Sequence, residues 1–161
     1  MLLTAMTESR LSLDAFIPYR LSFTSTLVSD SIARTYGRLF GISVPEWRVI
    51  AWVAQADGIT QQDICARTRM DKMTVSRATA SLTKRGLLER MPNAGDRRSH
   101  RLVLSGDGRA LHAQIAPKAL ELESRIFSRF EAREVADFVQ MLRRIDAAVL
   151  DIADQPGQET S

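Results

Sequence analysis

The sequence predicts a mainly α fold, a winged helix-turn-helix with a small β-hairpin wing, flanked by long N- and C-terminal helices. Three observations predict this class. Apolar residues recur at helical spacing through most of the 161 residues. Two short helical segments follow one another before residue 86, and the second is exposed and basic. The next segment then changes to two short strands around a turn-rich tip. We expect a single domain over residues 1–161, because this length suits one domain.

Composition limits the classes of protein to consider. Hydrophobic residues make up 45% of the chain and charged residues 25%, which is typical of a globular protein rather than a disordered one. No apolar run approaches the roughly 18–20 residues that cross a bilayer, and the N-terminus is a poor secretory signal. The single cysteine, Cys65, excludes an intrachain disulfide. We therefore expect a cytoplasmic protein with no membrane partner.

Positive charge is concentrated in the middle of the chain. The whole chain has a net charge of +3, but residues 67–101 contain ten Lys or Arg against three acids, a net +7. The remainder is therefore −4. A basic block inside a mildly acidic protein predicts a polyanionic partner such as double-stranded DNA. The alternative is a charged face that only contacts solvent.

The first half of the chain predicts one long helix and one short one. A helix is expected over 14–40, with Pro18 in its first turns and Gly41 at its end. Its two apolar rows indicate that it buries more than one face, and the second face would suit a partner chain. Ser43 and Glu46 then form a capping box for a helix that ends near residues 57–58.

The helix-turn-helix follows. Thr60 and Asp63 form a second capping box that opens the helix of TQQDICART, and Asp71 is an N-cap for the next helix, which Gly86 ends. Apolar residues at helical spacing give that second helix a core-facing stripe. Its other side is cationic and polar, with no carboxylate after the cap, and carries Lys72, Met73, Thr74, Ser76, Arg77, Ser81 and Lys84.

A wing and two long helices complete the chain. Residues 87–91 and 101–104 predict strands, and the tip between them, 92–100, carries Arg97 and Arg98 within reach of phosphates or a minor groove. Ser105 caps a helix over 107–127, and a last helix over 132–153 has an apolar stripe that needs a partner helix. We therefore assign 43–104 to DNA binding, and 13–40 and 105–154 to dimerisation.

Several stretches together make the chain resemble the MarR family of winged-helix transcription regulators. They are PEW at residues 45–47, ITQQDICART, DKMTVSRATASLTKRGLLER, the wing sequence GDRRSHRLVLS and the following GDGRAL. The resemblance runs from residue 43 to residue 111. The long flanking helices fit the family's dimerisation region, so the resemblance covers nearly the whole chain.

The resemblance implies a homodimer that binds pseudo-palindromic DNA, usually as a repressor released by a small ligand. It implies that Asp96 and Arg98 form an acid–arginine pair on the wing. The family often has a glycine where Arg69 stands and a small polar residue where Met73 stands; the first change adds a cation and the second an apolar reader of a thymine methyl group. The predicted DNA-binding residues are Lys72, Met73, Thr74, Ser76, Arg77, Arg69, Asp96, Arg97, Arg98 and Arg101.

An effector site is a separate expectation. Tyr19, Arg20, Phe23 and Trp47 combine aromatic surface with a cation near the junction of the dimerisation and DNA-binding parts. Because family members commonly bind aromatic or acidic metabolites in that region, an aromatic carboxylate or its thioester is the expected ligand. The alternative is that the aromatic residues belong to the core, Trp47 in particular, and that Arg20 is a surface charge.

Other functions have less support. His100 and His112 have no third partner at useful spacing, and the sequence has no phosphate-cradling glycine loop, Cys/His metal set or nucleophile elbow. We expect no enzyme activity, no cofactor and no metal. Cys65 could sense oxidants, but its expected inward position favours packing. The alternatives to a repressor are a transcriptional activator and a winged-helix module that binds a protein.

Overall fold

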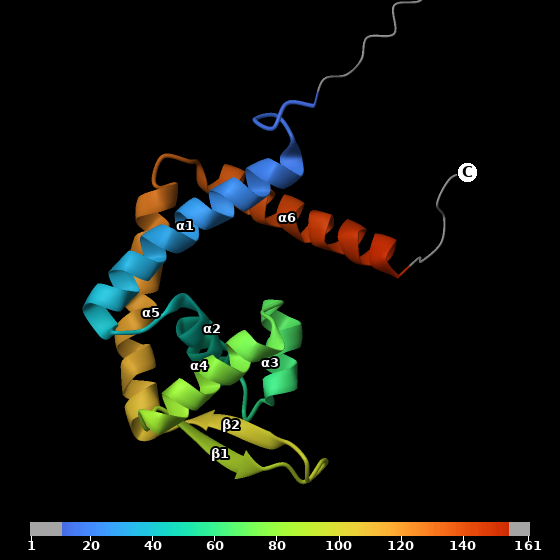
Figure 1. Ribbon diagram of the computed structural model, residues 1–161. Coiled ribbons are helices and arrows are strands. Elements are labelled where there is room, and N and C mark those ends of the chain that lie inside the picture. Colours follow the sequence, from blue (N-terminus) through green and yellow to red (C-terminus); the bar gives the residue numbers. More distant parts are fainter. Residues whose placement is uncertain (1–10, 155–161) are drawn as a thin grey trace, which may run out of the picture. The chain divides into compact units, whose positions relative to one another are not determined.

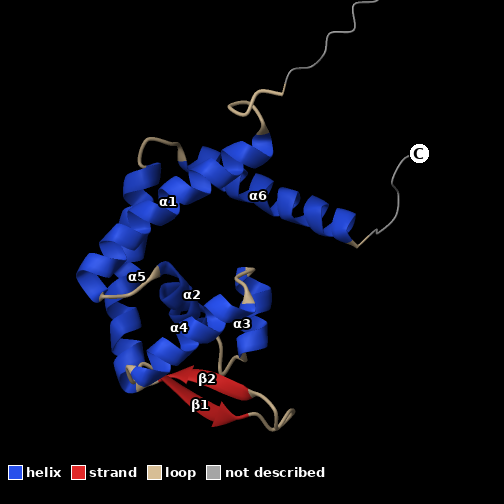
Figure 2. Cartoon of the chain, viewed as in Figure 1, coloured by secondary structure: helices blue, strands red, loops and turns tan. Residues whose placement is uncertain are grey.

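The computed structural model describes residues 11–154, and its internal contacts divide the chain into two compact units that meet between Pro117 and Lys118. We describe each unit by itself. The described part is mainly helical with one small antiparallel sheet, as the sequence predicts (Figures 1 and 2). The division into a DNA-binding part at 43–104 and dimerisation helices at 13–40 and 105–154 stays a prediction.

The first unit contains the helix-turn-helix and its wing. Its elements, in chain order, are α1 (Ile17–Phe40), α2 (Val44–Gln55), α3 (Gln61–Thr68), α4 (Lys72–Lys84), β1 (Leu88–Pro92), β2 (His100–Leu104) and the first part of α5 (Gly106–Phe127). The second unit contains the rest of α5 and α6 (Ala132–Ala153). Figure 1 shows α4 followed at once by the β1–β2 hairpin, the order expected of a wing.

The predicted helix ends are mostly confirmed. Both capping boxes form, Ser43 with Glu46 and Thr60 with Asp63, and Gly41 ends α1 in the left-handed conformation. α1 begins at Ile17 rather than Asp14, with Pro18 in its first turn. A proline is tolerated there because N–H groups of the first turn have no acceptor within the helix. α2 ends at Gln55, earlier than expected, because Ala56 turns to extended backbone.

The wing is an antiparallel hairpin attached to the turn before α3. Its register pairs Leu88 with Leu104 and Pro92 with His100, so β1 begins one residue later and β2 one residue earlier than predicted. Ile59 exchanges two backbone hydrogen bonds with Leu102, of 2.8 and 3.2 Å. The brief strand pairing expected of Ile59 is therefore present, and it ties the wing to the helix-turn-helix.

The core of the first unit packs against the buried side of α4. Fully buried side chains converge on it from α2, α3, α4 and β2, among them Ile50, Ile64, Val75, Leu82 and Leu102. α5 approaches this core closely at Gly108, where an added Cβ would overlap the carbonyl oxygen of Leu87. No side chain fits there, so glycine is what lets the start of α5 pack against the chain entering β1.

α6 contrasts with that core. None of its residues is buried, although its sequence repeats apolar residues at helical spacing. α5 contains Pro117, which sequence reasoning did not consider. A proline inside a helix removes one intrahelical hydrogen bond, and Pro117 is the last residue of the first unit along the chain. Within residues 11–154, no helix combines the length and apolarity needed to span a bilayer.

Candidate nucleic-acid interface

The amphipathic character of α4 separates a buried side from an exposed one. Val75, Ala78, Thr79 and Leu82 are buried and fix the helix on the core. The opposite side is exposed and holds most of the predicted reading residues: Lys72, Met73, Ser76 and Arg77. Met73 is 69% exposed. Single exposed apolar side chains are common on protein surfaces, so the predicted role of Met73 depends on its place beside Lys72 and Ser76 on the exposed side of α4.

The first turn of α4 is fixed by Asp71. Its carboxylate accepts hydrogen bonds from the N–H and the hydroxyl of Thr74, at 2.8 and 2.7 Å. These two bonds lower the pKa of Asp71, with the hydroxyl bond the stronger cause. The predicted N-cap is therefore confirmed. The Thr74 hydroxyl donates its proton to this cap and the residue is half-buried, so toward another molecule this hydroxyl can act only as an acceptor.

The turn between α3 and α4 contains a strained residue. Arg69 ends α3 with φ +58°, and it is the sole non-glycine residue with positive φ within residues 11–154. A side chain in the left-handed region costs free energy that glycine avoids. Arg69 thus adopts the conformation for which a glycine is expected at this turn. Its cation is exposed beside the start of α4.

Hydrogen bonds within the wing tip fix its backbone and leave its cations exposed. Asp96 accepts from the backbone N–H of Arg98 at 2.9 Å, and the Asn93 side chain donates to Ser99 at 2.8 Å. The acid expected to steady the Arg98 guanidinium therefore contacts the backbone of that residue instead. Arg97 and Arg98 are both exposed, as the sequence predicts.

Two cations of the basic block have structural partners. The Arg101 guanidinium donates to the carbonyl oxygens of Asp57 and Gly58, in the turn before α3. Arg67 lies over the Trp52 ring, 5.0 Å from its centroid. DNA binding by Arg101 stays a prediction, but its donors are directed at the fold. Counting charges in the sequence could not have made this distinction.

A cleft of about 250 Å³ separates the wing from the start of α3. Arg90, Arg98 and His100 line its wing side, and Thr60 and Gln62 line the other. Cations and the N-terminal end of a helix both attract anions. Arg90 was not among the predicted contacts. Its place opposite α3 follows from the strand register, which composition does not reveal.

The structure does not bring the four effector candidates together. Tyr19, Arg20 and Phe23 lie near the start of α1, where Arg20 is 5.3 Å from the Phe23 ring centroid and 3.4 Å from Asp14. Trp47 instead belongs to a second aromatic cluster, with its ring stacked on His112 and at 72° to Tyr36.

These two clusters lie about 20 Å apart along α1 at 1.5 Å per residue, since the first ends at Phe23 and the second includes Tyr36. The alternative interpretation of Trp47 as a structural residue therefore has the better support. The other three candidates remain together and exposed.

Cys65 is half-buried in α3 and has no disulfide partner. Its expected inward position is thus only partly reached, whereas the neighbouring Ile64 is completely buried. Within the described residues, no three His, Cys, Asp or Glu side chains come together in a group that could hold a metal ion.

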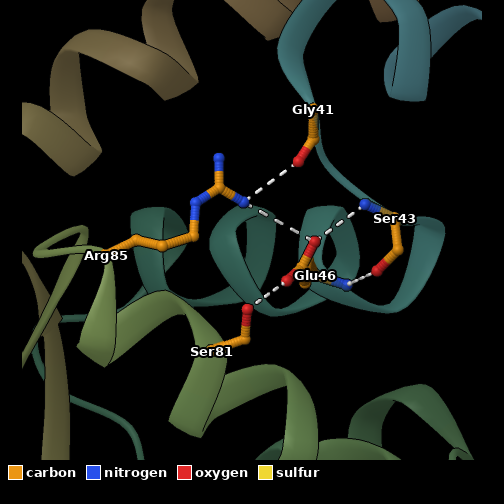
Figure 3. Close-up of polar contacts among 5 residues, drawn as sticks. All are labelled: Gly41, Ser43, Glu46, Ser81 and Arg85. Atoms are coloured by element: carbon orange, nitrogen blue, oxygen red, sulfur yellow. Dashed lines mark hydrogen bonds and ion pairs between the residues drawn. The ribbon is translucent and has the colours of Figure 1, made fainter.

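One polar cluster was missed by sequence reasoning. Ser81, placed with the outward face of α4, is half-buried and donates to Glu46 at 2.7 Å. Arg85 lies on the same carboxylate at 3.9 Å and also donates to the Gly41 carbonyl at 3.0 Å (Figure 3). The residues are up to 44 positions apart in the chain, so no local sequence signal joins them.

A basic, exposed helix followed by a basic wing is therefore present in three dimensions. Comparison with known proteins agrees with this arrangement: residues 40–99 match the sequence profile of the MarR family. This match covers 60 of the 161 residues, so the similarity to MarR family transcriptional regulators concerns the segment from the end of α1 to the wing. Among curated relatives, the chain is similar to the transcriptional regulator HosA of Escherichia coli O157:H7, with 26% identity over 119 residues, 74% of this chain and 88% of HosA.

Solved structures share the fold. A MarR/EmrR family transcriptional regulator from Acinetobacter sp. ADP1 superposes with a TM-score of 0.81 at 23% identity, over 88% of this chain and 99% of that one. Sco3205, a MarR family regulator from Streptomyces coelicolor solved in complex with DNA, gives a TM-score of 0.77 at 17% identity, over 86% and 89%. These relatives are regulators and not enzymes, which confirms the expectation that the chain has no enzyme activity.

Proposed function

We propose that this protein is a sequence-specific repressor of the MarR family that binds a pseudo-palindromic operator in the cytoplasm as a homodimer. The observation that carries the proposal is the exposed cationic side of α4 beside an exposed arginine pair on the wing. Arg77 and Lys72 would enter the major groove with Met73 and Ser76, while Arg97 and Arg98 contact phosphates or the minor groove. Phosphate contacts supply affinity and base contacts supply sequence.

Dimerisation is supported by apolar side chains that the described residues leave uncovered. In α1 they include Ile17, 65% exposed, and Leu27, 57% exposed; in α6 they include Val149, 58% exposed, and Ile152, 75% exposed. Burial of apolar surface stabilises by about 25 cal/mol per Å², so helices of this kind favour a partner. A two-fold dimer would place its two α4 helices about 34–36 Å apart, one turn of DNA.

A small ligand is proposed as the releasing signal, with Tyr19, Arg20 and Phe23 as the contacts to test. Two aromatic rings and a guanidinium suit an aromatic carboxylate or its thioester. A fold neighbour, CouR from Rhodococcus jostii RHA1, was solved bound to p-coumaroyl-CoA, with a TM-score of 0.74 at 19% identity. Ligands of this class that leave both the melting temperature and the DNA affinity unchanged would remove this part of the proposal.

Selection from a random-sequence DNA pool tests the main proposal. We expect the protein to enrich an inverted repeat whose half-sites lie one helical turn apart. With about three to five phosphate contacts in each half, log Kd against log salt should change with a slope of magnitude about 5 to 9. A pool without an enriched repeat would contradict sequence-specific binding. It would favour the alternative of a protein-binding winged-helix module, and reporter transcription then distinguishes a repressor from an activator.

A further inference from the structure

The C-terminal half of α4 is attached to the junction of α1 and α2 through Glu46. Figure 3 shows the contacts: the Ser81 hydroxyl donates to Glu46 Oε1 at 2.7 Å, and Arg85 Nη1 lies 3.9 Å from Oε2. The same Nη1 donates to the carbonyl of Gly41, the residue that ends α1, at 3.0 Å. Three helices therefore meet at one carboxylate and one guanidinium.

Helix capping alone does not explain these contacts. As part of the capping box of α2, Glu46 Oε2 accepts from the backbone N–H of Ser43 at 2.8 Å. That bond uses one oxygen of the carboxylate and is local to α2. The second oxygen accepts from a helix 35 residues further along the chain. Glu46 thus has a tertiary contact beyond the one that a capping box requires.

The environment of the carboxylate strengthens this contact. The Glu46 side chain is only 13% exposed. Partial burial raises the pKa of Glu46, but hydrogen bonds from Ser43 and Ser81 outweigh it, and the pKa lies below its usual value. Hydrogen bonds to an ionised group are about twice as strong as neutral ones. The 3.9 Å separation from Arg85 is at the limit of an ion pair, so the Ser81 bond is the stronger of the two attachments.

This attachment lies next to the predicted reading residues. Ser81 follows Arg77 by four residues and therefore lies one turn along the same side of α4. Glu46, Thr74, Arg77 and Ser81 line one cleft of about 320 Å³ between α2 and α4. A reading side chain must be held to about 0.5 Å to make its base contact. The contact from α2 is close enough to influence that placement.

We propose that Glu46 is a positioning residue for DNA reading, which holds α4 in a fixed orientation on the α1–α2 junction through Ser81 and Arg85. This inference rests on the proposed function, because it concerns how the reading helix is presented. Glu46 would thus affect DNA binding without contacting the DNA itself. Since α1 belongs to the proposed dimerisation region, the same contacts also relate the dimer interface to the placement of α4.

Two substitutions test the proposal, and two further substitutions serve as controls. Glu46→Ala removes every contact of the carboxylate, and Ser81→Ala removes only the hydrogen bond from the Ser81 hydroxyl to Glu46. Ser43→Ala is the matched control, because it loses the local bond from the Glu46 N–H to the Ser43 hydroxyl but leaves α4 attached. Glu89→Gln is the charge control: it removes one exposed negative charge from the wing strand β1.

The readout is Kd for the duplex that the wild-type protein selects, measured against a scrambled duplex of equal length. Glu46→Ala and Ser81→Ala should each weaken binding to the selected duplex, with Glu46→Ala losing about tenfold. Binding to the scrambled duplex should be unchanged or slightly stronger. Removal of negative charge alone predicts stronger binding, as expected for Glu89→Gln, so the sign of the change separates positioning from electrostatics.

Stability effects are separated by a partial rescue. Glu46→Gln keeps an oxygen that can accept from Ser81 and should recover part of the loss. If Glu46→Ala does not fold, Ser81→Ala retains the test, because it leaves the α2 cap intact. Selected-duplex binding that is equal to wild type in Ser81→Ala, or no weaker in Glu46→Ala than in Ser43→Ala, overturns the inference. Failure of the proposed function looks different, since the wild-type protein itself would then select no inverted repeat.

Discussion

Two amphipathic helices of this protein treat their apolar residues in opposite ways. α4 has 13 residues and buries four of them within its own unit. α6 has 22 residues and buries none, although several of its apolar side chains are more than half exposed. α4 is therefore packed within its own unit, whereas within residues 11–154 no side chain of α6 is buried. This difference agrees with the proposal that α4 reads DNA from within one chain and that α6 contacts a second chain.

The largest effect is expected from a charge on the apolar side of α6. Val149→Asp should prevent dimerisation, because a buried carboxylate at the interface would lose its hydration. Loss of the second half-site should then weaken operator binding by about 10²–10⁴-fold. Light scattering and operator titration measure the two effects. Gln140→Asp is the control, since it adds the same charge on the opposite side of α6, and a monomeric Gln140→Asp protein would refute the assignment of the interface.

The next largest change in DNA affinity is expected from a substitution on the exposed side of α4. Arg77→Ala should lose about 1–3 kcal/mol of binding free energy on the selected duplex and change the preferred bases. Arg98→Ala on the wing should instead weaken binding to all sequences by a similar factor, because it removes a phosphate contact. Kd measured on a panel of single-base variants separates them. Equal losses on every duplex for Arg77→Ala would contradict its role as a reader.

The packing of the first unit can be tested at Gly108. Gly108→Ala should lower the free energy of unfolding by at least about 1–3 kcal/mol, the cost of overpacking, because its Cβ would collide with the Leu87 carbonyl. Gly106→Ala in the same helix is the control, since an added Cβ there meets no atom within 4 Å apart from its chain neighbours and the backbone of its own helix. Denaturant unfolding measures both variants, and equal stability for the two would contradict the close approach of α5.

A smaller effect is expected at the strained turn. Arg69→Gly and Arg69→Ala both remove the cation, so each should lower the magnitude of the salt slope by about one per chain. Only glycine adopts a positive φ without strain. The free energy of unfolding of the glycine variant should therefore be about 1 kcal/mol higher than that of the alanine variant. Salt titration and denaturant unfolding give the two numbers. Alanine and glycine variants of equal stability would show that the φ of +58° is not strained.

The smallest effect is in the acid dependence of stability. The pKa of Asp71 is lowered by the Thr74 bonds and that of Asp63 by the Thr60 bonds. Because the folded pKa lies below the unfolded value of about 3.9, these caps stabilise at neutral pH, and the contribution is lost as the pH falls through the folded pKa. Between pH 7 and pH 3, the melting temperature should fall less for Asp71→Asn than for the wild-type protein. Asparagine keeps a capping oxygen but has no carboxylate to protonate. An unchanged acid profile would contradict this assignment.

Sequence reasoning predicted best where the signal is local. The capping boxes at Ser43 and Thr60, the N-cap at Asp71 and the wing after Gly86 each depend on residues a few positions apart, and all are present. It failed to foresee contacts between distant segments. The attachment of Ser81 to Glu46 is set by how α2 packs on α4, and a periodicity pattern does not contain that information.

The candidate site shows the same limit. The pattern placed Lys72 and Arg77 on the exposed side of α4 and the structure agrees, because the buried stripe determines the opposite face. The roles of Arg101 and Trp47 were harder to predict, since both depend on neighbours from other elements. Charge and aromaticity describe what a side chain can bind, and only the packing decides whether a partner within the chain already holds it.

The anchoring of the hairpin has a practical consequence for engineering. Ile59 pairs with Leu102, and Arg101 donates to the carbonyls of the turn before α3, so the base of the wing is joined to the start of α3. The distal loop at 93–99 is closed by bonds among its own residues. Loops of other length or charge should therefore be exchangeable at that end without disturbing the scaffold, which offers a way to retune target choice one module at a time.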